Sequence, residues 1–307
     1  MAHYLITGGA GFIGSHLVEW LLAAGHRLTV VDDFSTGSRD NLPAHPELAI
    51  VAHDLLALTR EHLAGPFAAV AHLAALPSVN DSWTQLVKAH AINLTGTVRV
   101  IELAQQLKIP RLVFASSAAV YGDTDVVPIE EMQRLRPTSP YGLQKKSSEE
   151  YGQLFAGRNF SFVALRFFNV FGPRQVANSP YSGVITKFVQ AMRENEPVTI
   201  FGTGGQTRDF VYVKDVASGI ARALEVPGLD PFTVCNLGRG SAVSIRQLAR
   251  TLRAFFPDWQ KPSRDAPARL GDIVHSVADI SVAQRLLSYR PRYTLESGLA
   301  EMLALVK

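Results

Sequence analysis

Short apolar runs alternate with segments of helical periodicity over the first 170 residues of the chain. Several of these runs, each of strand length, are separated by stretches such as 15–24, where apolar residues recur at helical spacing and Gly25 supplies a C-terminal cap. The expected strands cover residues 3–7, 27–31, 48–54, 68–74, 111–117 and 161–170. This alternation predicts an α/β fold with a doubly wound parallel sheet, covered by helices on both faces.

The pattern changes beyond residue 172, where loops rich in Gly, Pro and Ser alternate with shorter elements. Helices are expected near 183–194, 214–225, 244–256 and 279–287. We therefore divide the chain into a nucleotide-binding core over residues 1–170 and a smaller C-terminal substrate-binding cap over residues 171–307, interleaved with the core.

Composition narrows the functional classes. The 307 residues are 47% hydrophobic and 19% charged, as in a globular protein with a sizeable core, and the formal net charge is +3. The basic residues are scattered, so no nucleic-acid partner is expected. The chain shows no signal peptide and no apolar run of the ~18 residues that span a membrane, so we expect a cytoplasmic protein without membrane contact. The single cysteine, Cys235, excludes a disulfide framework, and the nine histidines lack metal-ligand spacing.

A glycine-rich turn joins the first expected strand to the first helix. Gly8, Gly11 and Gly14 let the backbone approach a pyrophosphate, and the helix N-terminus offers free N–H groups and a positive dipole end. The alternative, a glycine-rich turn without a ligand, is the less frequent one between a strand and a helix. The GxxGxxG spacing resembles the extended branch of the short-chain dehydrogenase/reductase superfamily, and this resemblance implies a Rossmann-type domain.

Acidic residues follow the second and third expected strands. The Asp32 carboxylate can accept hydrogen bonds from an adenosine ribose and would repel a 2′-phosphate, which favours NAD over NADP, although Arg39 lies nearby in the sequence. Asp54 either contacts the adenine amine, as the resemblance implies, or caps a helix. The resemblance also implies cofactor contacts at Phe12, Ile13, Asp33, Ser35, Thr36, Gly37, Leu55, Leu73, Ala74, Ala75 and Asn93, the last as a support of the active-site backbone.

Tyr141 and Lys145 stand four residues apart in an expected helix, so they share one helix face. A phenol has a reference pKa of about 10, and a nearby cation shifts that pKa towards neutrality, which would let Tyr141 exchange a proton with a sugar hydroxyl. The alternative is a surface Tyr and Lys on an exposed helix. Ser117, at the end of the fifth expected strand, adds a hydroxyl beside the reacting group.

Ser117, Tyr141 and Lys145 match the catalytic Ser–Tyr–Lys set of this superfamily, and Tyr141 and Lys145 also contact the cofactor in that set. The match continues through RFFNVFGPRQ, TRDFVYVKD and RLGDIVHSVADIS, and the chain resembles the UDP-glucose 4-epimerase family of NAD-dependent nucleotide-sugar enzymes. The resemblance implies removal and return of the C4 hydrogen of a UDP-sugar through a 4-keto intermediate. It also implies substrate contacts at Ser117, Asn169, Gly183, Val184, Phe188, Ile200, Phe201, Arg208, Arg269, Asp272 and Ser276, the two arginines on the diphosphate.

Residues that differ from those of related enzymes narrow the set of reactions expected for this chain. Nucleotide-sugar dehydratases and decarboxylases of this type carry acidic residues directly after the active-site hydroxyl, whereas this chain has Ala118 and Ala119. Epimerases for uronic acids usually have Thr in place of Asn169 and an Arg seven residues later, where this chain has Val176. A neutral hexose is therefore favoured.

Two further positions bear on the ligands. Ser276 matches a gatekeeper position where a bulky Tyr excludes N-acetyl sugars, so UDP-GlcNAc and UDP-GalNAc stand beside the preferred UDP-glucose and UDP-galactose. Pro77 replaces a family lysine near the cofactor diphosphate. A 4-keto nucleotide-sugar reductase, an epimerase for a dTDP-hexose or a UDP-uronate, and a non-catalytic dinucleotide sensor remain the alternatives. The family resemblance also implies a homodimer through helices near 84–107 and 141–157.

Overall fold

A central parallel sheet organises the molecule. The computed structural model describes residues 1–157, 159–175, 183–268 and 273–305. Its seven-stranded sheet contains only parallel neighbours, in the spatial order β11 (Phe232–Leu237), β6 (Ser161–Phe167), β5 (Arg111–Ser117), β4 (Ala69–His72), β1 (His3–Thr7), β2 (Arg27–Asp32) and β3 (Leu48–Ala52). The predicted doubly wound α/β class is confirmed, and the strand order reverses between β1 and β4.

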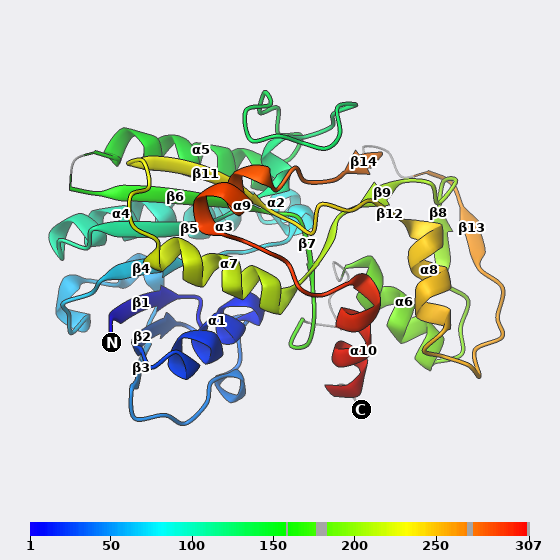
Figure 1. Cartoon of the computed structure of the whole chain (residues 1–307), viewed down its shortest axis with the longest axis horizontal. Coiled ribbons are helices and arrows are strands. Elements are labelled where there is room, and N and C mark those ends of the chain that lie inside the picture. Colours follow the sequence, from blue (N-terminus) through cyan, green and yellow to red (C-terminus); the bar gives the residue numbers. More distant parts are fainter. Residues whose placement is uncertain (158, 176–182, 269–272, 306–307) are drawn as a thin grey trace.

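Successive residues of a strand point to opposite sides of the sheet, and both sides carry buried apolar side chains. Ile6 of β1 packs in one apolar cluster with Leu17, while its neighbour Leu5 packs in another with Val100. Figure 1 shows the helices on the two sides of the sheet. The first face is covered by α1 (Phe12–Ala23), α7 (Val213–Glu225) and α9 (Ser281–Leu287), and the second by α4 (Gly96–Gln106) and α5 (Pro140–Phe155).

A smaller unit with its own apolar cluster lies beside the sheet (Figure 1). Its helices are α6 (Val184–Arg193), α8 (Ile245–Arg253) and α10 (Leu295–Leu305). Its short strands pair as β7 (Asn169–Phe171) with β10 (Phe210–Tyr212), β8 (Thr199–Phe201) with β13 (Arg264–Ala266), and β9 (Thr207–Arg208) between β12 (Val243–Ser244) and β14 (His275–Ser276).

The chain passes between the two units more than once. After β10 the chain returns to the main sheet through α7 and β11, and it returns again through α9. The apolar run around Cys235, interpreted from the sequence as a buried strand, forms β11 at one end of the sheet. The helices expected beyond residue 183 are present as α6, α7, α8 and α9, whereas the division of the chain at residue 170 stays a prediction.

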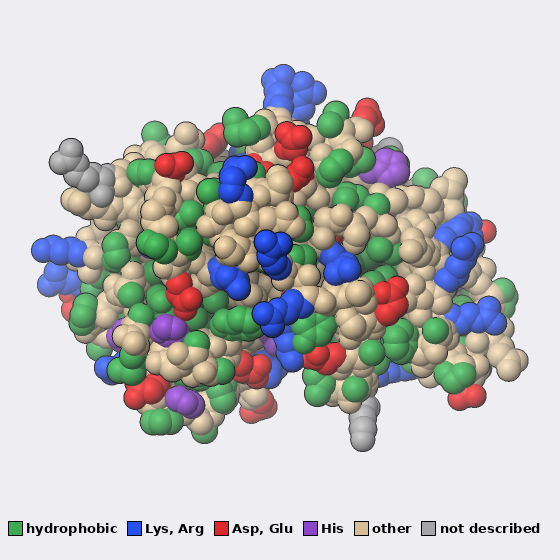
Figure 2. All heavy atoms as spheres, in the orientation of Figure 1, with side chains coloured by type: hydrophobic (Ala, Val, Ile, Leu, Met, Phe, Trp, Pro, Cys, Tyr) green, Lys and Arg blue, Asp and Glu red, His purple; other side chains and the backbone are tan. Residues whose placement is uncertain are grey.

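The expected helical stretch 84–107 is not continuous. It contains the end of α2 (Val79–Thr84), then α3 (Leu86–His90), a π-helical turn at Ala91–Thr95, and α4. In the part of the chain that the structure describes, no helix is long and apolar enough to cross a membrane. On the face in Figure 2, Lys and Arg side chains form several separate groups with acidic side chains among them.

Candidate active site

A cavity lies over the carboxyl ends of the central strands, where open α/β sheets bind ligands. It brings together segments that are far apart in the sequence: the turn after β1, the end of β2, the loops after β3 and β4, and the start of α5. The predicted cofactor residues that line it are Gly8, Gly11, Phe12, Ile13, Gly14, Asp32, Asp33, Ser35, Thr36, Asp54, Leu55, Leu73, Ala74, Ala75, Tyr141 and Lys145.

The glycine-rich turn needs its glycines for steric reasons. Gly8 has φ +71°, and a Cβ there would lie 2.5 Å from the backbone nitrogen of Ala74. A Cβ on Gly14 would lie 2.1 Å from the carbonyl oxygen of Gly8, so α1 starts in direct contact with the turn. Because no acidic residue occupies the first turn of α1, its N–H groups remain available to an anion. This cradle fits the pyrophosphate of a dinucleotide.

Asp32 is buried at the end of β2 and lines the same cavity. Its carboxylate accepts hydrogen bonds from the backbone N–H of Ala10 and of Phe34, each at 2.9 Å. Burial raises the pKa of Asp32, while these two hydrogen bonds lower it. The side chain therefore fixes the loop that carries it, and its remaining lone pairs face the cavity where a ribose would bind.

Of the two alternatives left open for Asp54, the structure shows the helix cap. Its carboxylate accepts from the backbone N–H of Leu56 at 2.9 Å, which caps a short 3₁₀ helix at Leu55–Ala57. The same residue lines the cavity. The contact between Asp54 and adenine stays a prediction.

Two predicted cofactor residues are not among those that line the cavity. Gly37 packs against the glycine-rich turn, since a Cβ there would lie 2.8 Å from the Ala10 carbonyl. Asn93 is buried, accepts from the backbone N–H of Leu76 at 2.8 Å, and donates to the Gln144 side chain at 2.8 Å. Asn93 thus ties the loop after β4 to α5, behind the cavity wall.

The three predicted catalytic residues lie together at the edge of the sheet. Tyr141 and Lys145 project from α5, whose first turn is capped by the Ser139 hydroxyl, and Ser117 ends β5. The Ser117 side chain lies close enough to Tyr141 to lower the pKa of the phenol. The Lys145 ammonium donates to the carbonyl of Ala115 at 2.8 Å and lies 5.7 Å from the centre of the Tyr141 ring.

Their ionisation differs from the prediction made from sequence. Burial raises the pKa of Tyr141 to about 12, although the Ser117 side chain lowers it. Burial also lowers the pKa of Lys145 to about 7, although the carboxylate of Glu149 raises it. The predicted shift of the Tyr141 pKa towards neutrality by a nearby cation is therefore not seen in the polypeptide, because loss of water disfavours the charged form of both residues.

A second cavity opens in the smaller unit, between α6, β8 and β9. Five predicted substrate residues line it: Asn169, Val184, Phe188, Phe201 and Arg208. Ile200 instead points into the apolar cluster of that unit, because its neighbours Thr199 and Phe201 take the cavity side of the short strand.

The other predicted substrate residues lie elsewhere. Gly183 precedes α6 and Ser276 is buried in β14, and neither lines the second cavity. The predicted contacts at Arg269 and Asp272, and the comparison made at Val176, fall outside the described residues.

Several lining residues were missed from the sequence. Lys187 lines the second cavity with Val184 and Phe188, and helical spacing from Val184 was a signal that pointed to it. In the first cavity, Lys88 and His53 come from segments without a motif, so only the folded chain places them there. Among the described residues, no group of three or more His, Cys, Asp and Glu side chains is arranged to hold a metal ion.

The strand order, the glycine-rich cradle and the Ser–Tyr–Lys group together define a dinucleotide-binding enzyme of the short-chain dehydrogenase/reductase type. The model of the NAD dependent epimerase/dehydratase family matches residues 4–238, so the chain belongs to that family. Its cofactor is accordingly NAD, and its reaction class is the epimerisation of nucleotide sugars.

Relatives and solved structures that resemble this chain span almost its whole length. The chain is 33% identical to a putative UDP-glucose 4-epimerase of Methanocaldococcus jannaschii, over 99% of this chain and 98% of that protein. A UDP-N-acetylglucosamine 4-epimerase from Methanobrevibacter ruminantium, in complex with UDP-N-acetylmuramic acid, superposes with a TM-score of 0.93 at 35% identity, covering 99% and 98% of the two chains. A UDP-glucose 4-epimerase from Thermotoga maritima with UDP-glucose has a TM-score of 0.91 at 32% identity, with coverage of 99% and 98%.

Proposed function

We propose that this protein is a UDP-sugar 4-epimerase that interconverts UDP-glucose and UDP-galactose, and that also accepts UDP-GlcNAc and UDP-GalNAc. The observation that carries the proposal is the placement of Ser117 next to the buried Tyr141 and Lys145. In the sequence, Ser117 is followed by Ala118 and Ala119 instead of acidic residues. A site with one proton-transfer side chain suits removal and return of a proton on one oxygen. Elimination needs a further acid or base.

The residues of the first cavity would hold NAD through the glycine-rich turn and the Asp32 carboxylate. When bound, NAD supplies the hydride acceptor and donor and brings the positive charge of its nicotinamide ring. Tyr141 would take the proton of the sugar 4-hydroxyl and return it, and Ser117 would hydrogen-bond the same oxygen. A Tyr141 pKa of about 12 means that the protein's own groups, Lys145 included, leave the phenol protonated, so the charge of the bound ligands must favour the phenolate.

The second cavity supports nucleotide binding in the smaller unit. Arg208 stands on β9, and its planar guanidinium suits two diphosphate oxygens. Phe188 and Val184 on α6 offer apolar contacts to a base, with Asn169 opposite at the start of β7. Ser276 pairs in register with Arg208 through β14, so a small side chain stands beside the diphosphate anchor.

One experiment tests the reaction. Purified protein is incubated with UDP-galactose and no reductant, and with a panel of UDP-GlcNAc, UDP-glucuronate and dTDP-glucose, and the products are identified by nuclear magnetic resonance. Net formation of UDP-glucose supports the proposal. Turnover only of keto sugars with NAD(P)H, or only of UDP-glucuronate, would replace it by a reductase or a uronate epimerase.

A matched pair of variants tests the assigned base. Tyr141→Phe removes the phenol and should abolish turnover while bound NAD is retained. Tyr151→Phe makes the same change at an exposed position of α5 and should leave turnover unchanged. Residual activity in Tyr141→Phe would show that another group moves the proton.

We also propose that the protein is a homodimer. An apolar surface runs over α2, α3 and the outer side of α5, and these helices are in contact with one another. Its exposed side chains include Trp83, Leu86, Val87, Leu143 and Leu154. Burial of such a surface against a second copy is favourable at roughly 25 cal/mol per Å². Leu154→Glu, at a side chain 81% exposed, should give a monomer in analytical ultracentrifugation, and a monomeric wild type would reject the proposal.

A further inference from the structure

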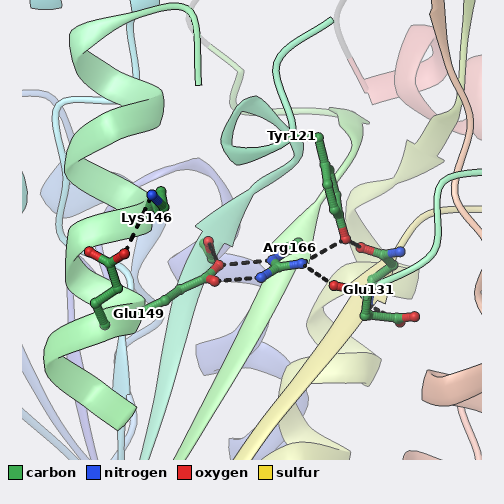
Figure 3. Close-up of polar contacts among 8 residues, drawn as sticks. Tyr121, Glu131, Lys146, Glu149 and Arg166 are labelled. Atoms are coloured by element: carbon green, nitrogen blue, oxygen red, sulfur yellow. Dashed lines mark hydrogen bonds and ion pairs between the residues drawn. The ribbon is translucent and has the colours of Figure 1, made fainter. Parts of the chain in front are cut away.

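A buried polar network lies beneath the three candidate catalytic residues. At its centre, Arg166 of β6 forms a two-bond ion pair with Glu149 of α5, at 3.0 Å from Nε and 2.6 Å from the second guanidinium nitrogen (Figure 3). Both side chains are about 5% exposed or less. Charges are seldom buried this far from water unless each hydrogen bond is made, so the pair calls for an explanation.

The network reaches the catalytic strand on one side. The hydroxyl of Ser116 donates to the Glu149 carboxylate at 2.5 Å, and Ser117 is the next residue of β5. One helical turn before Glu149, Lys145 donates to the carbonyl of Ala115 at 2.8 Å. Two consecutive residues of β5 are thus held by α5, directly before the residue that contacts Tyr141.

On the other side, the network reaches the strand at the end of the sheet. Arg166 also donates to the Tyr121 hydroxyl at 3.0 Å and to the backbone carbonyl of Glu131 at 2.9 Å (Figure 3). Tyr121 in turn donates to the side chain of Asn236 in β11 at 2.6 Å. All five donors of a guanidinium point in fixed directions, so Arg166 sets the spacing of these elements.

The charged and titratable groups that face Lys145 come from three elements. On α5 they are Tyr141 and Glu149, on β4 His72, and on β6, beyond Glu149, Arg166. Burial lowers the pKa of His72 to about 3, so this imidazole stays neutral. Among these groups, Glu149 is the carboxylate, and its charge raises the pKa of Lys145.

We propose that Glu149 and Arg166 are positioning residues for the reaction: the pair clamps the end of β5 to α5 through Ser116, and the Glu149 carboxylate, four residues from Lys145 on the same helix, favours the charged form of its amine. Ser116 is the member of the network that lines a cavity, whereas Glu149 and Arg166 line neither. The pair therefore acts on the reaction through Ser117 and Lys145. This inference rests on the proposed function where it concerns turnover. Its charge effect concerns the polypeptide alone.

The decisive variant is Glu149→Gln, which keeps the shape and an acceptor but removes the charge. Lysine labelled with carbon-13 at the ε position is incorporated, and the Lys145 resonance is assigned by its loss in Lys145→Gln. We expect the Lys145 titration midpoint to fall by about 1 pH unit, and the alkaline limb of kcat to move down with it. At pH 7 the charged fraction, and with it kcat, falls about fivefold.

Matched variants separate this effect from general damage. Glu150→Gln makes the same change one residue further along α5, at an exposed side chain paired with Lys146 at 3.4 Å, and should change neither measurement. Glu149→Asp keeps the charge and should restore the midpoint. Ser116→Ala removes only the strand contact, so we expect a lower kcat with an unchanged Lys145 midpoint and an unchanged KM.

The outcomes decide between the proposals. An unchanged Lys145 midpoint in Glu149→Gln, or an equal shift in Glu150→Gln, would overturn the charge effect, and a wild-type kcat in Ser116→Ala would overturn the clamp. If Glu149→Gln does not fold, Glu149→Gln with Arg166→Met removes both charges and is expected to shift the midpoint in the same direction. Absence of epimerisation by the wild type would reject the proposed function alone, because the lysine titration needs no substrate.

Discussion

The contact between α1 and the glycine-rich turn makes a quantitative prediction for Gly14→Ala. The new Cβ would start 2.1 Å from the Gly8 carbonyl oxygen and 2.8 Å from the Gly9 Cα, both backbone atoms that cannot rotate away. To reach the 3.0 Å below which real Cβ contacts are essentially never seen, helix and turn must separate by 0.9 Å. Overpacking of this kind costs about 1–3 kcal/mol, against about 1 kcal/mol gained from helix propensity at this position.

Because a 2.1 Å approach is a severe clash, we take the upper half of that cost, about 2–3 kcal/mol. We therefore expect Gly14→Ala to lower the free energy of unfolding by about 1–2 kcal/mol and the melting temperature by about 2–4 °C. Separation of α1 from the turn also moves its N–H groups away from a bound pyrophosphate. We expect NAD to bind about tenfold more weakly, which corresponds to about 1.4 kcal/mol. Circular dichroism follows melting, and isothermal titration calorimetry follows NAD binding.

Gly11→Ala is the matched control in the same turn. Its Cβ would meet only the Gly8 carbonyl oxygen, at 3.3 Å, and would face the cavity. We expect less than about 1 kcal/mol of destabilisation, with weaker NAD binding as the main effect. For a chain of this length, 1 kcal/mol shifts the melting temperature by about 2 °C. Gly14→Ala protein that melts within about 1 °C of wild type and binds NAD normally would therefore refute the steric reasoning.

Two further predictions concern stability. Phe162 of β6 is fully buried against α5, so Phe162→Ala should lower the free energy of unfolding in urea by about 3–5 kcal/mol. Phe155 is exposed, so Phe155→Ala should lower it by less than about 0.5 kcal/mol. Burial raises the pKa of Asp209 to about 6 from the model-compound value of 3.8, against backbone N–H groups of Arg239, Gly240 and Ala278 that lower it. The native state therefore binds the proton more tightly than the unfolded chain, so this residue's stabilisation is complete below about pH 4 and is lost as the pH rises through about 6. In urea unfolding from pH 4 to 7, wild type should lose about 3 kcal/mol relative to Asp209→Asn, and parallel curves for the two proteins would contradict the linkage.

The main sheet was predictable because its strands are buried on both faces and separated by helices of regular period. Most of the first six strands are built around a run of apolar residues, which is the sequence signature of that environment, whereas β3 at the edge of the sheet is partly exposed. The seventh strand was recognisable at Cys235 as a buried run, but its place beside β6 was not. Strand order at the end of a sheet depends on tertiary contacts of α7 and the segments between, and no local pattern encodes it.

In the candidate site, too, local features are predictable from the sequence and features set by tertiary contacts are not. The fixed helical spacing of Tyr141 and Lys145 and the turn geometry at Gly14 are local, so sequence patterns predict them. The pKa of Lys145 depends on its burial against Phe114 and on Glu149, which itself is held by Arg166 of another strand. The Ile200 side chain packs in the apolar cluster and does not line the second cavity. Its strand has three residues, which is too short for an alternation from which the core-facing side could be read.

The late arrival of β11 has a consequence for synthesis of the chain. On a ribosome, residues 1–170 emerge first and contain six of the seven parallel strands, but β6 keeps one open edge until residues 232–237 follow. The six register pairs between β6 and β11 run from Phe162 to Phe167, so this edge is apolar over most of its length. An open apolar edge is a site of aggregation, and roughly 60 residues at 5–20 residues per second leave it uncovered for several seconds. A nascent chain stalled before residue 232 should therefore be a preferred client of chaperones that bind extended apolar segments.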